Sequence, residues 1–203
     1  MILYHINNKP DVCLEVGKTI TIGKDVNYLF SGCYNLASSF LYNVDNSGKE
    51  PTNYYKPFRE FLSGEKFNQL TEEQKQNYIN YLNEYLRKSN IFHREIILEE
   101  VRKKRFRRKP SRQKCIYLTD LQSLEHWVRI LNGMKNKYEI YEVETMDEPF
   151  VSTDSLLPNV NRPLELQKKD AEHYWKPTQE DLRYATDREY LYTGELKVLR
   201  RVK

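Results

Sequence analysis

The chain has 203 residues, a formal net charge of +4 and 39% hydrophobic residues. This length predicts one domain that can bury a substantial core without disulfide bonds or metal. No apolar run approaches the roughly 20 residues that span a bilayer, and the N-terminus lacks the basic start and apolar stretch of a signal peptide. A cytoplasmic protein that does not enter membranes is therefore expected.

The cysteines and histidines argue against two further classes of protein. The three cysteines, Cys13, Cys33 and Cys115, are odd in number and widely spaced. This pattern fits neither a disulfide framework nor a zinc site. The four histidines show no metal-ligand spacing with one another or with the cysteines. The sequence thus predicts a reduced chain without a metal site.

The first part of the chain predicts short strands. Residues 1–6, MILYHI, form one, and residues 18–24, KTITIGK, alternate polar and apolar side chains between two turn glycines. Residues 35–55 carry Asn, Ser, Gly and Pro at high density after an apolar stretch. We expect a short helix there, followed by a loop.

The middle of the chain predicts two helices. Thr71 and Gln74 have the spacing of a capping box at the start of the first. Asn90 is suited to cap the second helix, which Pro110 ends. The first helix carries an apolar stripe at helical spacing, which is more often part of a core than a ligand platform. The stripe consists of Tyr78, Tyr81, Leu82, Tyr85 and Leu86.

After Pro110 the pattern changes to strand, helix and strand. Residues 115–118 are short and β-prone, and Asp120 is suited to cap a helix that ends near Gly133. Residues 138–143, YEIYEV, alternate as a strand does. This stretch therefore joins a short strand directly to a helix and then to a longer strand.

The last part of the chain predicts a long connection before two final strands. Residues 146–168 show little periodicity and are long enough to suggest a functional loop. A short helix is expected at 171–175, and strands at 189–191 and 195–202 are separated by a turn at Gly194. Strands and helices are segregated irregularly along the chain, so the fold class expected is α+β rather than an alternating α/β fold.

A dense basic segment lies between the second helix and the strand at 115–118. Such a density of cations favours phosphate-bearing partners. The alternative, with about equal weight, is a solvated helix end, where cations also suit the helix dipole. The segment contains Arg102, Lys103, Lys104, Arg105, Arg107, Arg108, Lys109, Arg112 and Lys114.

Three segments far apart in the chain form a recognisable order. YHI stands at 4–6 with glycines in the next twenty residues, IYLT at 116–119 leads into a helix with Trp127, and REYLYTGELKVL stands at 188–199. This order resembles the His-Tyr-Glu type of the ADP-ribosyltransferase superfamily. It is similar to small bacterial members such as the rifampin ADP-ribosyltransferases, and to an uncharacterised bacterial family with PSR and YW elements.

The resemblance implies a fold and three catalytic roles. The fold would be a split β-sandwich in one domain, 1–203, with a helical insert at about 51–109. His5 would bind a ribose hydroxyl of NAD, Tyr117 would stack on the nicotinamide ring, and Glu189 would stabilise the oxocarbenium-like ribose. Considered singly, each has a structural alternative, as a core histidine, a core aromatic residue or a surface carboxylate.

The resemblance also implies further contacts with NAD and with an acceptor. Ser111 and Arg112 would meet the pyrophosphate, since arginine suits bidentate phosphate contacts. Trp127 would either line the pocket or anchor its helix. The expected NAD-binding set is His5, Tyr4, Ser111, Arg112, Tyr117, Thr119, Trp127 and Trp175. The expected acceptor-binding set is Arg105, Arg107, Arg108 and Lys109.

The function expected from the resemblance is NAD-dependent mono-ADP-ribosylation of a macromolecule, with nucleic acid slightly favoured over protein. Bacterial members of this kind are often toxins or defence effectors, which implies an antitoxin-like neutralising partner. An NAD glycohydrolase, or a non-catalytic nucleic-acid-binding protein that uses residues 102–114, are the alternatives. If Glu189 is purely catalytic, its replacement by alanine should change stability little.

Overall fold

The computed structural model describes most of the chain and divides it into two compact units. The described residues are 1–8, 14–27, 29–33, 68–133 and 138–203. Unit 1 comprises residues 1–27 and 94–203, and unit 2 comprises residues 28–93. Each unit is considered by itself. The short helix and loop expected at 35–55 lie outside the described residues.

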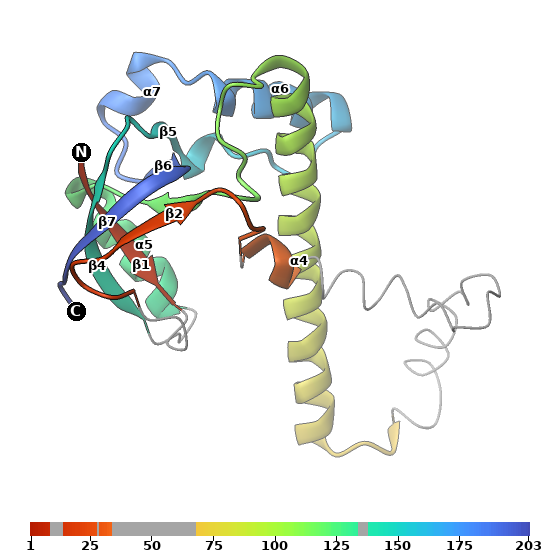
Figure 1. Ribbon diagram of the computed structural model, residues 1–203. Helices are drawn as coiled ribbons and strands as arrows, with labels where there is room; N and C mark the ends of the chain where they lie inside the picture. Colours follow the sequence, from red (N-terminus) through yellow and green to blue (C-terminus); the bar gives the residue numbers. More distant parts are fainter. Residues whose placement is uncertain (9–13, 28, 34–67, 134–137) are drawn as a thin grey trace, which may run out of the picture. The chain divides into compact units, whose positions relative to one another are not determined.

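The larger sheet of unit 1 has four antiparallel strands in the order β1-β4-β7-β2. The strands are β1 (Ile2–Asn7), β2 (Thr19–Ile22), β4 (Glu139–Thr145) and β7 (Gly194–Arg201). Strand β4 alternates in burial because one of its faces lies on the core. Figure 1 shows β7 and β4 crossing the middle of this sheet.

A second antiparallel sheet has three strands in the order β3-β6-β5. These are β3 (Ile116–Leu118), β5 (Phe150–Thr153) and β6 (Arg188–Tyr192). Because side chains alternate along a strand, β6 serves two cores. Tyr190 and Tyr192 face one core, while Glu189 and Leu191 face the other.

The two cores lie on opposite faces of the three-stranded sheet. The first joins the two sheets and consists of Leu3, Leu118, Tyr141, Val143, Tyr192, Leu196 and Val198. The second joins the three-stranded sheet to helices and consists of Ile97, Leu98, Val101, Cys115, Ala171, Tyr174, Trp175 and Leu191. Two antiparallel sheets combined with helices confirm the α+β class.

Several helices of the described residues differ from expectation, most clearly in the middle of the chain. One helix, α4 (Glu72–Arg105), replaces the two expected in the middle of the chain. Asn90 is an exposed position inside it rather than a cap. Asparagine costs only some tenths of a kcal/mol more than alanine inside a helix, and nearby ion pairs such as Arg87–Glu84 at 2.8 Å support α4 there.

Two expected helix starts are confirmed. The Gln74 backbone N–H donates to Thr71 Oγ1 at 3.2 Å, and the Thr71 N–H donates to Gln74 Oε1 at 2.9 Å, which forms the capping box of α4. Asp120 Oδ1 accepts from the Ser123 N–H at 2.8 Å and so caps α5 (Leu121–Gly133).

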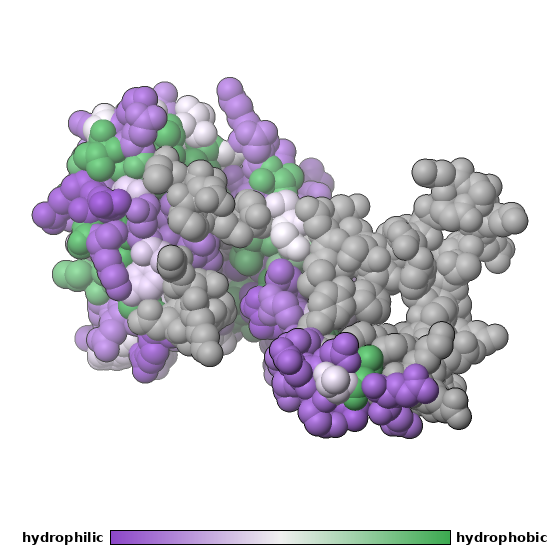
Figure 2. All heavy atoms as spheres, turned by 90° about the horizontal axis from the view of Figure 1, so that it is seen from below, coloured by the Kyte–Doolittle hydropathy of each residue, from purple (hydrophilic) through white to green (hydrophobic). Residues whose placement is uncertain are grey.

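The connection at 146–168 holds more structure than its sequence suggested. It contains β5 and a 3₁₀ turn, η1 (Asp154–Leu156), and its end begins α6 (Leu164–Trp175). A short helix, α7 (Gln179–Arg183), was also missed. In the described part of the chain no helix combines the length and the apolar character of a membrane span. Hydrophilic side chains cover much of the face in Figure 2.

Gly194 gives a testable backbone requirement at the start of β7. Its φ is +130°, and an added Cβ would lie 3.0 Å from Tyr192 Oη, which is held by its bond to the Glu195 carbonyl at 2.7 Å. We expect Gly194→Ala to lower the free energy of unfolding by about 1–3 kcal/mol. Gly17→Ala is the control, because Gly17 has φ +85° but open space around it. Equal losses in urea unfolding would contradict a role for the Tyr192 contact.

Candidate functional site

The centre of the site is a buried arginine on the turn that follows Pro110. Arg112 is only 2% exposed. Its Nε donates to Glu95 Oε2 at 2.7 Å and its Nη2 to Glu95 Oε1 at 3.1 Å, a bidentate pair with α4. Its Nη1 donates to Glu189 Oε1 on β6 and to Tyr174 Oη on α6. One guanidinium thus ties three elements together.

Two tyrosines complete what we call the Arg112 cluster: Arg112, Glu95, Glu189, Tyr117 and Tyr174. Tyr174 Oη donates to Glu189 Oε1 at 2.7 Å, and Tyr117 Oη donates to the Arg112 carbonyl at 2.9 Å. The guanidinium carbon lies 5.2 Å from the Tyr117 ring centroid and 5.0 Å from that of Tyr174. These are cation–π distances, so the rings stabilise the charge as well as enclosing it.

The electrostatics of the cluster follow from its burial. Burial alone would lower the pKa of Arg112, but the charges of Glu189 and Glu95 outweigh it and raise that pKa well above its ordinary value. Burial also raises the pKa values of Tyr117 and Tyr174, so both phenols stay neutral. Two carboxylates, Glu95 and Glu189, face the Arg112 guanidinium, and Arg94 Nε lies 3.7 Å from Glu95 Oε1 at the edge of the cluster.

The three residues expected to form the catalytic set are only partly brought together. Tyr117 on β3 pairs with Leu191 on β6, two residues beyond Glu189, so Tyr117 and Glu189 share a face of the sheet. His5 lies on β1 and contacts the backbone of β3, with its Nδ1 3.0 Å from the Tyr117 carbonyl oxygen. Among the described contacts none joins His5 to Glu189.

His5 is held in a defined protonation state. A carbonyl oxygen only accepts, so Nδ1 carries the proton and donates it. Burial lowers the pKa of His5 below 6.5, although the bond to Tyr117 partly offsets this. His5 is therefore neutral near pH 7, and Nε2 is an acceptor with no hydrogen-bond partner in the described part of the chain.

The lowered pKa of His5 predicts a loss of stability in mild acid. Below about pH 6.5 the unfolded chain takes up a proton at His5 more readily than the folded chain does, so the free energy of unfolding falls as pH falls. His5→Gln keeps a donor for the Tyr117 carbonyl but does not titrate. Urea unfolding between about pH 7 and 5 should therefore show a shallower decline for the variant. Identical slopes would contradict the assignment.

Three residues expected to contact NAD have structural partners instead. Arg112, expected at the pyrophosphate, is 2% exposed and pairs with two carboxylates, which argues against that contact. Thr119, 3% exposed, donates from Oγ1 to the Arg188 carbonyl at 3.1 Å. Trp175 is fully buried and donates from Nε1 to the Leu98 carbonyl at 2.9 Å. None of the three presents a free polar atom to a ligand.

The remaining residues expected to bind NAD and not yet described, Trp127, Ser111 and Tyr4, are only partly buried. Trp127 Nε1 donates to the Arg188 carbonyl at 3.0 Å, which favours its alternative role as the anchor of α5 on β6. Ser111 Oγ donates to Glu99 Oε2 at 3.1 Å. Tyr4 is partly exposed, and its backbone bridges to that of Thr119 in both directions at 2.8 Å.

The sequence did not predict that Glu95 and Tyr174, two central members of the cluster, would contact Arg112. Glu95 precedes the buried Leu98 by three positions, so the buried stripe of α4 passes through it. That spacing was a usable signal. Tyr174 precedes Trp175 at the end of α6, and adjacency of two aromatic residues does not show which one meets a charge.

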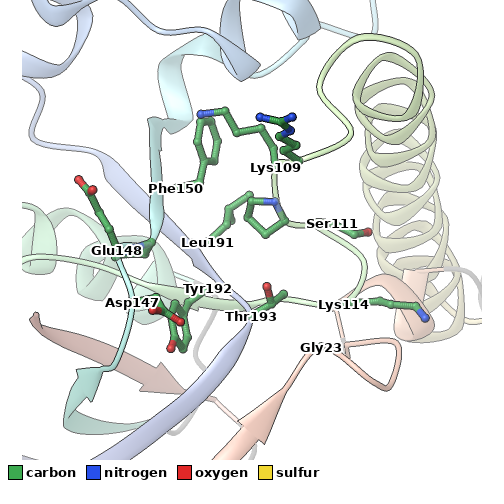
Figure 3. A pocket seen from close by; sticks show the side chains of 13 residues that line it. Gly23, Lys109, Ser111, Lys114, Asp147, Glu148, Phe150, Leu191, Tyr192 and Thr193 are labelled. Atoms are coloured by element: carbon green, nitrogen blue, oxygen red, sulfur yellow. The ribbon is translucent and has the colours of Figure 1, made fainter.

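The expected acceptor-binding cations divide into two groups. Arg105 pairs with Glu172 at 2.6 Å, and Arg107 Nε donates to the Lys103 carbonyl at 2.8 Å. Arg108 and Lys109 make no ion pair with any residue that the structure describes. These two residues lie at a pocket of about 400 Å³ in unit 1, which Figure 3 shows from close by.

The fold and site define an α+β protein with a buried arginine–carboxylate cluster on the helix-covered face of its three-stranded sheet. Across residues 3–203 the chain matches the model of the DUF2441 family, described as proteins of unknown function, and it belongs to this family. A search of curated proteins gives no match. Within the described residues, no three His, Cys, Asp or Glu side chains gather as metal ligands do.

Proposed function

We propose that the chain is an NAD-dependent mono-ADP-ribosyltransferase with an ADP-ribosyltransferase-like split β-sandwich core. One observation carries the proposal: Tyr117 and Glu189 lie on one face of the neighbouring strands β3 and β6. An aromatic ring beside a carboxylate suits a flat cationic ring attached to a ribose. NAD presents this pair of groups as nicotinamide and its ribose.

The hydrogen bonds of Glu189 support the same proposal. Cleavage of the glycosidic bond of NAD puts positive charge on the ribose, and a carboxylate held in place beforehand stabilises it. Glu189 Oε1 is bound by Arg112 and Tyr174. Its Oε2 accepts no hydrogen bond from the described residues, so Oε2 is the atom offered to the ribose 2'-hydroxyl.

Arg112 acts in this proposal as a positioning residue. It holds Glu189 through Oε1 and covers one face of the Tyr117 ring at 5.2 Å. A bound nicotinamide would therefore stack on the opposite face of Tyr117. His5, neutral with Nε2 free, would accept a hydrogen bond from a ribose hydroxyl.

The reaction proposed breaks the bond between C1' of the ribose and the nicotinamide nitrogen. The bonding electron pair leaves with nicotinamide, which becomes neutral. A nucleophile of the acceptor then forms a bond to C1' and loses its proton. With a macromolecule as acceptor the product is an ADP-ribosylated nucleic acid or protein, and with water it is free ADP-ribose.

The test is turnover of labelled NAD by the full chain in a cell extract. We expect release of nicotinamide and transfer of label to a macromolecule that either nuclease or protease digests. Free ADP-ribose without a labelled macromolecule would instead identify a glycohydrolase. If the chain neither binds NAD nor releases nicotinamide, the proposal is wrong.

A further inference from the structure

The pocket beside the Arg112 cluster has two walls of opposite charge. One wall comes from the connection after α4 and includes Arg108, Lys109 and Lys114. The other comes from the turn between β4 and β5, with Asp147 and Glu148. Figure 3 shows the two acids on one side and Lys109 and Lys114 away from them.

The basic wall collects the cations that remain unpaired. Within the basic segment the helical side chains are satisfied, since Arg102 pairs with Glu99 at 2.8 Å and Lys104 with Glu100 at 2.6 Å. By contrast, Arg108, Lys109 and Lys114 form no ion pair with a described residue. The alternative interpretation, a solvated helix end, thus fits α4 but not the residues that follow it.

The acidic wall is unpaired as well. No described residue forms an ion pair with Asp147 or Glu148, although Lys109 lines the same pocket. Because the basic and acidic side chains line one pocket but form no ion pair with each other, a ligand can lie between them. Such a ligand would offer an anion to the lysines and hydrogen-bond donors to the carboxylates.

An aromatic surface lies on the basic side. Lys109 Nζ stands 4.5 Å from the centroid of the Phe150 ring, and Figure 3 shows the lysine chain reaching over that ring. The ring holds the ammonium near the pocket by a cation–π contact. The pocket volume of about 400 Å³ is within the range of pockets that bind small molecules.

We infer that this pocket binds a phosphorylated nucleotide, free or as one unit of a single strand. Its phosphate lies against Arg108, Lys109 and Lys114, and its ribose hydroxyls or base amino groups donate to Asp147 and Glu148. Binding depends on these side chains alone and not on NAD turnover.

The position of the pocket suggests its use. Leu191 lines it and lies two residues beyond Glu189 on the same face of β6, about 7 Å along the strand. A nucleotide held there is close to the proposed catalytic carboxylate. It is therefore the acceptor of the transfer, a role that, unlike the binding itself, rests on the proposed function.

The experiment compares two double variants by fluorescence anisotropy with a short labelled single-stranded RNA. Lys109→Gln/Lys114→Gln removes two pocket cations, and Lys103→Gln/Lys104→Gln removes two exposed cations of α4 as a matched control. We expect the pocket variant to bind at least about tenfold more weakly and to show a salt slope smaller by about 2. The control should bind as the wild type does.

Competitors identify the source of the ligand. AMP that displaces the RNA shows that one nucleotide unit fills the pocket. AMP binding without RNA binding assigns the site to a free nucleotide. Asp147→Asn/Glu148→Gln should reduce the preference for AMP over inorganic phosphate, because phosphate has no ribose or base to meet the acids.

Failure of this inference is separable from failure of the proposed function. Loss of RNA binding in the α4 variant but not in the pocket variant would overturn the inference, as would no binding of either RNA or AMP by the wild type. Nicotinamide release by the wild type in the same preparation would then show that only the pocket assignment is wrong.

Discussion

Arg112→Met should lower the free energy of unfolding by about 3–5 kcal/mol. The substitution removes the guanidinium that pairs with Glu189 and the nearer of the two that pair with Glu95, the other being Arg94 at 3.7 Å. Glu189, 5% exposed, would then be buried without a counter-charge, and Tyr174 would lose its donor. The measurement is urea unfolding followed by circular dichroism, with the unfolding slope checked for two-state behaviour.

A triple variant separates charge from packing in that result. Arg112→Met/Glu95→Leu/Glu189→Leu leaves the cluster without any charge, and apolar replacements of buried ion pairs are often neutral or stabilising. We expect it to recover most of the stability lost by Arg112→Met. If the single variant unfolds within about 0.5 kcal/mol of the wild type, the cluster does not hold the fold together.

The same contacts revise an expectation about Glu189. A purely catalytic carboxylate should be replaceable by alanine with little change in stability. Glu189 instead bonds Arg112 and Tyr174 and is 4% exposed. Its removal takes away the carboxylate that accepts from both Arg112 Nη1 and Tyr174 Oη, so Glu189→Ala is a poor test of catalysis because it also weakens the fold.

Local patterns were enough to predict most elements. The alternation in YEIYEV predicted β4, and the spacing of Thr71 and Gln74 predicted the start of α4. Both are decided by residues close together in the chain. Strand β5 was missed because four residues after a proline carry too little periodicity, and only pairing with β6 makes them a strand.

The Arg112 cluster could not be predicted in this way. Arg112 belongs to a run of cations, and such a run usually faces solvent or phosphate. Its burial depends on Glu95, 17 positions before it, and on Glu189, 77 positions after it. No local pattern shows that two acids so distant in sequence will meet one arginine. A cation's neighbours in sequence therefore say little about its neighbours in the fold.

A comparison of two conservative substitutions tests whether Glu189 is catalytic. Glu189→Gln and Glu95→Gln each remove one carboxylate from Arg112 and keep the shape of the side chain. We expect Glu189→Gln to lower nicotinamide release from NAD by about 100-fold or more, because the amide cannot stabilise the positive ribose. Glu95→Gln should keep release near the wild-type level, since it leaves Glu189 and its free Oε2 in place.

Both variants should be measured at equal folded fraction, since each weakens the same ion-pair cluster. Equal losses in the two would show that the carboxylates act through Arg112 and the fold, which would remove Glu189 from the catalytic role. A loss confined to Glu189→Gln cannot come from the charge of the cluster, because both substitutions change that charge by one. It would place the reacting ribose at Glu189.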